Sequence, residues 1–203
     1  MKKILLLFLI VFISCDVITN QKIDSEYHKN TVFVSDNEYP ENFENKKAEK
    51  LYNKAIFYQS IRNIDKAIEL YKKSIDLEPN EATFNQLGLS YNTKYEHKSG
   101  LNSFQDAIKL NPTFWAAQYN LAHSYFYFKD YENSEKILNK IISNSNSKHF
   151  IDSSYLILAA IYNNRKDYKT AYKLINKCKD LKDDTEMRNF YNKIRGIIIK
   201  QMN

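Results

Sequence analysis

The chain has 203 residues, of which only three are Gly and three are Pro, so the many tight turns of an antiparallel sandwich or barrel would be hard to build. Its formal net charge of +6 comes from Lys and Arg residues interspersed with Asp and Glu rather than gathered into one run. This pattern indicates a solvated mixed-charge surface, argues against a nucleic-acid-binding protein, and leaves a helical protein as the favoured class.

The first 15 residues are typical of a secretory signal. Two lysines precede an unbroken apolar run from Ile4 to Ile13, and Ser14 and Cys15 follow at once. The run is too short for a membrane-spanning helix, which needs about 20 apolar residues. The last four residues, Phe12 to Cys15, resemble the lipobox of bacterial lipoproteins, although Phe12 stands where Leu is more common. The resemblance implies removal of residues 1–14, lipidation (palmitate) of Cys15 and a place in the bacterial cell envelope; plain secretion is the alternative.

Residues 15–47 are polar, with a few isolated apolar side chains and no helical or strand period, so we expect a flexible lipidated tether. Such a tether would have a root-mean-square span of about 30 Å. A short strand at 31–34 is the alternative for its middle. Loss of the two lysines in the signal would leave a net charge of +4 on the mature chain.

An internal repeat organises the rest of the chain. The segments SIDLEP (74–79) and AIKLNP (107–112) lie 33 residues apart, and extending their alignment gives four copies. The copies resemble the tetratricopeptide repeat, although the third and fourth lack the closing Pro. The resemblance implies an all-α fold, a right-handed superhelical stack of four helix-turn-helix hairpins at about 48–80, 81–114, 115–151 and 152–184.

Each copy places a small residue where its two helices should approach closely, because a large side chain there would force the hairpin open. The predicted pairs are Ala55 with Ala67, Gly88 with Gly100, Ala122 with Ser134, and Ala159 with Ala171. The turns agree, since Lys-Asp-Tyr recurs at 129–131 and 166–168 with an Asp that can cap the second helix. The longer third copy predicts a polar loop at 143–147.

One more amphipathic helix is predicted at 185–203, with Met187, Phe190, Ile194, Ile197 and Ile198 on one side. Stacked repeats leave their last apolar face uncovered, so we expect this helix to cap it. A homodimer formed through the same helix is the alternative.

The resemblance also implies binding, because in this family the first helix of each hairpin lines a concave groove that holds protein or peptide partners. Amides there can pair with an extended backbone, and aromatic rings offer flat apolar area. The expected function is an anchored adaptor in envelope assembly or secretion, with its partner unidentified; the alternative is a small-ligand or glycan-binding protein that uses the same rings. The groove residues carried over are Tyr52, Gln59, Asn85, Asn92, Tyr119, His123, Phe126, Tyr127 and Asn163.

No catalytic, metal or cofactor site is predicted. The four histidines are far apart in sequence, and no Gly-rich phosphate loop or nucleophile elbow occurs. Cys178 falls at a small-residue core position, which favours a buried inert thiol over a nucleophile. We therefore expect a protein that is not an enzyme.

Overall fold

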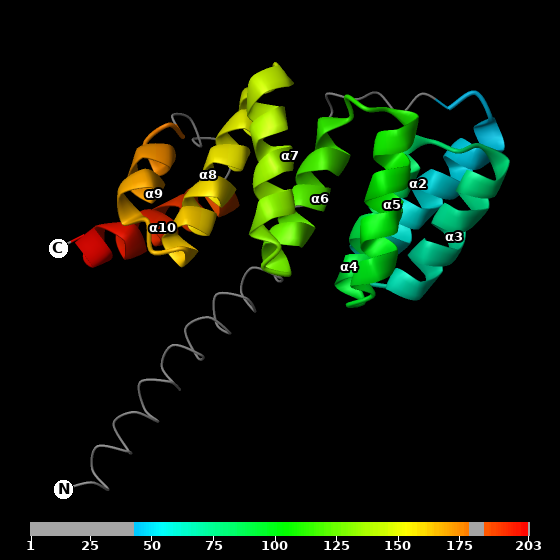
Figure 1. The fold of residues 1–203 in the computed structure, drawn as a ribbon. Helices are drawn as coiled ribbons and strands as arrows, with labels where there is room; N and C mark the ends of the chain where they lie inside the picture. The colour runs from blue at the N-terminus through cyan, green and yellow to red at the C-terminus, as the bar shows by residue number, and fades with distance from the viewer. Residues whose placement is uncertain (1–42, 179–184, 203) are drawn as a thin grey trace, which may run out of the picture. The chain divides into compact units, whose positions relative to one another are not determined.

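The computed structural model describes residues 43–178 and 185–202 (Figure 1). The predicted signal, Cys15 and residues 15–42 of the predicted tether lie outside them. Every regular element of the described part is a helix. The helices are α2 (Lys46–Ser60), α3 (Ile64–Leu77), α4 (Glu81–Thr93), α5 (His97–Leu110), α6 (Trp115–Tyr127), α7 (Tyr131–Asn144), α8 (Lys148–Asn164), α9 (Tyr168–Ile175) and α10 (Thr185–Met202).

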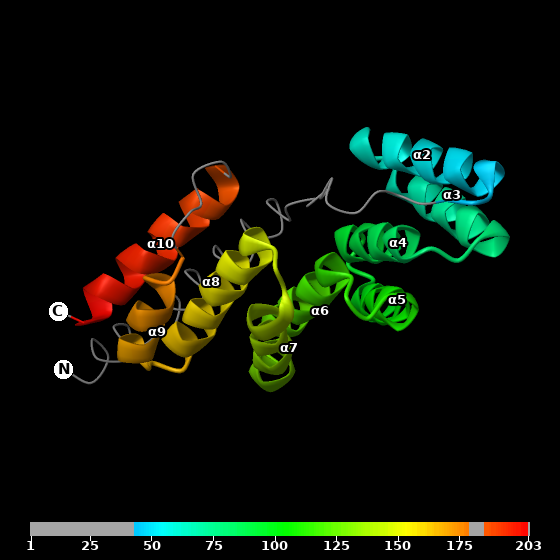
Figure 2. The same ribbon diagram turned by 90° about the horizontal axis from the view of Figure 1, so that it is seen from above.

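The first eight of these helices form four hairpins, and each hairpin packs against the next (Figures 1 and 2). The pairs are α2 with α3, α4 with α5, α6 with α7, and α8 with α9. The first helix of the third hairpin, α6, also contacts α4 and α8, so residues 114–122 have almost no exposed surface. The all-α stack of four hairpins predicted from the repeat is confirmed.

The small residues lie where the repeat predicts them, buried between the helices of each hairpin. A Cβ atom at Gly100 would lie 3.1 Å from the carbonyl oxygen of Gly88, so these two glycines face each other. In the third hairpin the Ser134 hydroxyl donates to the carbonyl oxygen of Ala122 at 2.8 Å. These contacts explain why no bulky side chain occupies the paired positions.

All four turns inside the hairpins have one backbone geometry. One residue of each turn has a φ of 62° or 63°, and these residues are Arg62, Tyr95, Lys129 and Lys166. The next residue donates its N–H to the carbonyl five positions earlier, as Asp130 does to Tyr125 at 2.9 Å. The side chains of Asp130 and Asp167 then cap α7 and α9, as predicted. Each turn therefore holds a non-glycine residue in the left-handed region.

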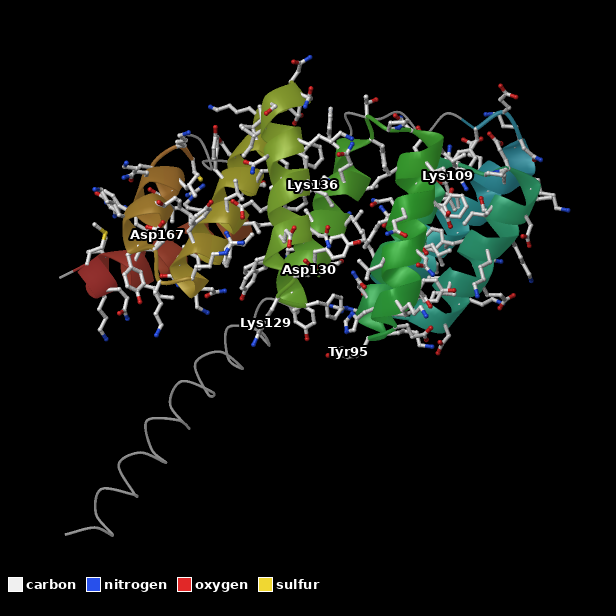
Figure 3. All side chains as sticks on the ribbon, viewed as in Figure 1. Tyr95, Lys109, Lys129, Asp130, Lys136 and Asp167 are labelled. Carbon is white, nitrogen blue, oxygen red and sulfur yellow. The ribbon has the colours of Figure 1, made fainter. Side chains whose placement is uncertain are left out.

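Replacing Lys129 with glycine is expected to stabilise the protein by about 1 kcal/mol, because glycine adopts this φ without steric cost. Lys136→Gly is the control, since the same change inside α7 should destabilise by about 1 kcal/mol. Midpoints of urea unfolding would compare the two variants (both positions are labelled in Figure 3). Destabilisation by Lys129→Gly would contradict the expectation.

The junction of the third and fourth hairpins differs from the prediction. Ser143 and Asn144 belong to α7, and α8 begins at Lys148, so the connection spans only residues 145–147. The extra residues lengthen α8 to 17 residues, against 13 in α4 and α6. The added turn brings in Phe150, which is completely buried, and this burial favours the extension of α8 by one turn.

The start of the first hairpin lies earlier than the predicted tether boundary at residue 47. Phe43 is buried, and its ring lies 5.3 Å from the ring of Tyr52. The Glu78 carboxylate accepts from the backbone N–H of Glu44 and, at 2.7 Å, of Asn45. Residues 43–47 therefore belong to the folded part, because one aromatic side chain and two hydrogen bonds fix them.

The last helix covers the end of the stack, as predicted. Ile194 and Ile198 are buried among apolar side chains of α8 and α9, with Phe190 partly buried beside them. The side chain of Met187 lies outside the described residues. No helix within residues 43–178 and 185–202 has the length and apolar character needed to cross a membrane.

Candidate functional site

The nine predicted groove residues lie on the first helices of the hairpins, and none of them is fully exposed. Four are buried: Tyr52, Gln59, Asn85 and Tyr119. The other five keep part of their surface open: Asn92, His123, Phe126, Tyr127 and Asn163. The structure thus divides the set into side chains that pack inside the stack and side chains that reach its surface.

Two of the predicted amides connect neighbouring hairpins. The Asn120 Nδ2 donates to Asn85 Oδ1 at 2.9 Å, in a buried position between α4 and α6. The Asn92 Nδ2 donates to the Ser124 hydroxyl at 3.1 Å, and its Oδ1 points at Gly100, where a Cβ atom would lie only 2.4 Å away. These contacts engage both amides within the fold, so we leave Asn85 and Asn92 out of the binding surface.

The residues predicted from the first hairpin belong to its core. The hydroxyl of Tyr71 donates to Gln59 Oε1, and both side chains are buried. The ring of Tyr52 lies between those of Phe43 and Tyr71, at 5.3 and 5.8 Å. Phe43 covers the position that the repeat pattern assigns to the groove, so this hairpin contributes neither residue to an open surface.

The predicted aromatic residues of α6 differ in what covers them. Tyr119 is buried because Phe150, from the added turn of α8, lies 6.1 Å away between ring centres. His123 stacks on Tyr119 at 6.4 Å and is only partly buried. Phe126 packs against Tyr131 at 5.9 Å and likewise keeps part of its surface open.

Tyr127 belongs to an aromatic cluster that the sequence did not predict. Its ring lies 5.5 Å from that of His97 at the start of α5, and Phe128 lies 4.9 Å from the same imidazole. Tyr95, in the turn before α5, lies 6.0 Å from His97 and is 69% exposed (Figure 3). The sequence does place aromatic residues beside two successive turns, at Tyr95 and at Tyr127 with Phe128. Only the packing of α5 against α6 shows that these residues meet around His97.

The half-buried side chains that the fold leaves for binding come from α6 and α8. We call His123, Phe126, Tyr127 and Asn163 the inner surface. Phe126 and Asn163 occupy the same position in successive copies, four residues after the small residues Ala122 and Ala159. The inner surface therefore combines aromatic area with an amide, a composition suited to recognising polypeptide.

A polar network fixes the third hairpin to the fourth. The hydroxyl of Tyr162 donates to Glu135 Oε1 at 2.6 Å, and Arg165 donates to Oε2 at 2.7 Å. Burial raises the pKa of the Glu135 carboxyl, but these two hydrogen bonds outweigh it and leave the pKa below its usual value. The carboxylate is thus held in its charged form, and its two hydrogen bonds join α7 to the C-terminal part of α8.

Cys178 has the surroundings of an inert thiol. Its sulfur donates weakly to the carbonyl oxygen of Asp152, 3.4 Å away, and burial raises the pKa of the thiol to about 12. Residues 43–178 and 185–202 contain no group of three or more His, Cys, Asp or Glu side chains that could hold a metal ion.

Alkylation of native Cys178 by iodoacetamide at pH 8 is expected to be about 1000-fold slower than that of an ordinary cysteine, because only the thiolate reacts. The rate is measured by mass spectrometry on the peptide that contains Cys178. Unfolding in urea should restore an ordinary rate and serves as the control. Equal rates in the two states would contradict the burial of this thiol.

Comparisons with known proteins agree with the repeat. Residues 45–81 and 116–147 match the Tetratricopeptide repeat family. A structure of MamA from Desulfovibrio magneticus RS-1 is 14% identical, with a TM-score of 0.59 over 78% of this chain and 94% of that one. A crystal structure of a MamA protein is 19% identical, with a TM-score of 0.60 over 77% and 88% of the two chains. At such identities the likeness concerns the fold alone. A search of curated protein sequences found no match.

Proposed function

We propose that this chain, which is a tetratricopeptide repeat protein, acts as a lipid-anchored scaffold that binds a protein or peptide partner with its inner surface. The repeats support the general role, since stacked hairpins of this family present surfaces for protein interaction. The choice of this surface as the binding site is supported by the partial exposure of His123, Phe126 and Tyr127 on one helix. Rigid aromatic side chains of this kind supply contact area at low entropic cost.

The proposed anchor is a lipid on Cys15, supported by the basic start, the short apolar run and the lipobox-like residues before it. One acyl chain gives only weak and reversible membrane binding, whereas the two or three chains of a lipoprotein hold a protein firmly. An anchored scaffold of the bacterial envelope would bring its partner to the membrane. Assembly or secretion in the envelope is the process that such a tethered adaptor would serve.

The anchor is tested by fractionating cells that express the wild type, Cys15→Ser or Cys178→Ser. We expect Cys15→Ser to move the protein from the membrane to the soluble fraction. The Cys178→Ser control removes the other thiol and should stay on the membrane. Retention of Cys15→Ser on the membrane would overturn the lipid anchor. It would not bear on the proposed binding of a partner, which is tested next.

Binding is tested by affinity purification from a detergent extract with a double variant of the inner surface, His123→Ala with Tyr127→Ala. The control, Lys136→Ala with Lys140→Ala, changes two exposed residues of α7. We expect a partner that the wild type and the control retain and the inner-surface variant loses. A partner retained equally by all three proteins would assign binding to another surface.

A further inference from the structure

Positive charge is concentrated at the C-terminal end of the repeat stack. Residues 43–147 contain 14 Lys and Arg against 12 Asp and Glu, whereas residues 148–203 contain 12 against 6. The last hairpin with α10 therefore has a net charge of +6, against +2 for the first three hairpins together. The even mixture of charges along the sequence conceals this difference.

Part of this charge forms a row along α9. Lys169 and Lys173 are four residues apart on one side of α9, and Lys166, in the turn before the helix, and Lys177, just after its end, flank its two ends. All four side chains are exposed. Asp167 is the one acidic residue between 165 and 178, and its carboxylate accepts from the Thr170 N–H at the start of α9. The row thus has little opposing charge within its own helix (Asp167 is labelled in Figure 3).

The neighbouring helix α10 adds cations of its own. It packs directly against α9, and residues 188–202 contain four Lys and Arg but no Asp or Glu. All four are exposed, Arg195 and Lys200 among them. The acidic side chains of residues 180–186 lie outside the described part of the chain, and the net charge of +6 already includes them. Two adjoining helices therefore present the same sign of charge.

We propose that this cationic face, formed by Lys166, Lys169, Lys173, Lys177, Arg195 and Lys200, binds the anionic phospholipid headgroups of a bilayer. Lysines are flexible point charges, and when they are spread over α9, its flanking residues and α10 they suit a diffuse anionic surface better than one defined ligand. The inference rests on the proposed lipid anchor, which would keep the face near headgroups. A lipid and a polybasic surface acting together bind a membrane more firmly than either alone.

The equivalent helix of the third hairpin supplies a matched control. In α7, Lys136 and Lys140 have the same spacing as Lys169 and Lys173 and are also exposed. Glu132 and Glu135 lie on that helix as well, so its net charge is zero. A lysine of α7 therefore matches a lysine of α9 in chemistry and exposure but not in its electrostatic surroundings.

The test reconstitutes the full chain, purified from membranes, into vesicles of phosphatidylcholine alone or with phosphatidylglycerol. An amine-reactive reagent then labels the lysines, and mass spectrometry gives the rate at each position. We expect Lys169 and Lys173 to react severalfold more slowly on the anionic vesicles, and Lys136 and Lys140 to react equally on both. In about 1 M salt, where charges are screened beyond roughly 3 Å, the difference should disappear.

A double reversal, Lys169→Glu with Lys173→Glu, should abolish the slower labelling at Lys166 and Lys177, while Lys136→Glu with Lys140→Glu should leave it intact. Each lysine near an anionic surface increases the affinity for the membrane about fivefold, so reversing the charge of two lysines should lower that affinity at least about 25-fold. Equal labelling on both vesicles, with the chain still anchored, would overturn the cationic face alone. Release from neutral vesicles with retention on anionic ones would overturn the anchor and support the face.

Discussion

Replacing Ile198 with alanine is expected to destabilise the C-terminal part of the stack by about 2–5 kcal/mol. Ile198 has no exposed surface and packs among Leu156, Ala159 and Ile175 of the last hairpin. The change would leave a cavity where α10 covers the apolar end of the repeats. Because each hairpin contacts mainly the elements next to it in the stack, the loss should be greatest in α8, α9 and α10.

Hydrogen exchange of the backbone amides measures this effect helix by helix. Ile199→Ala is the control, since it removes the same atoms from the next residue of α10, which is only partly buried. We expect Ile198→Ala to speed exchange in α8 and α9 while leaving α2 and α3 nearly unchanged. If the two variants behave alike, α10 does not act as a cap.

Gly88→Ala is the second substitution with a large expected effect, a destabilisation of about 1–3 kcal/mol. Alanine normally stabilises a helix relative to glycine, but here its Cβ would lie 2.5 Å from the Cε1 atom of Phe104. That ring is completely buried, so α4 and α5 would have to move apart. The cost of this overpacking should exceed the gain in helix propensity.

The same substitution at Gly196 provides the comparison. Gly196 lies in α10, and a Cβ atom there would meet nothing within 4 Å. Gly196→Ala should therefore stabilise the protein by about 1 kcal/mol, the ordinary difference in helix propensity. Thermal unfolding of both variants tests the pair. A stabilising Gly88→Ala would show that the hairpin has room at this position.

The fold could be predicted because the repeat period and its small residues indicate where the helices of each hairpin lie. The positions of the small residues, such as Gly88 and Gly100, follow directly from the period, since two helices can approach closely only there. The turns carry an independent signal in Asp130 and Asp167, whose capping role depends on neighbouring residues alone. Features that depend only on neighbouring residues or on the repeat period could therefore be predicted from the sequence.

The binding residues were less predictable, because their exposure depends on what the neighbouring segments contribute. Tyr119 is covered by Phe150, which comes from a helical turn just after the predicted polar loop, and the repeat pattern did not include this turn. Asn85 is engaged by Asn120, a contact across 35 residues that does not follow the period of 33. Side-chain partners of this kind emerge only from the packing of one hairpin on the next.

The distribution of charge shows the same limit. The sequence alternates cations and acids closely enough to suggest a mixed surface, yet Asp167 and Glu135 are engaged in a helix cap and a network between hairpins. The lysines of α9 remain exposed, and their grouping becomes visible only when the helix and its neighbour α10 are placed together.

The most direct test of the scaffold role is photo-crosslinking in living cells, with a photoreactive phenylalanine analogue in place of Tyr127. The same analogue in place of Lys136, on the exposed side of α7, is the comparison. We predict a discrete adduct with one partner from position 127 and none from position 136. An absence of adducts at 127, or the same adducts from both positions, would contradict a partner bound at the inner surface.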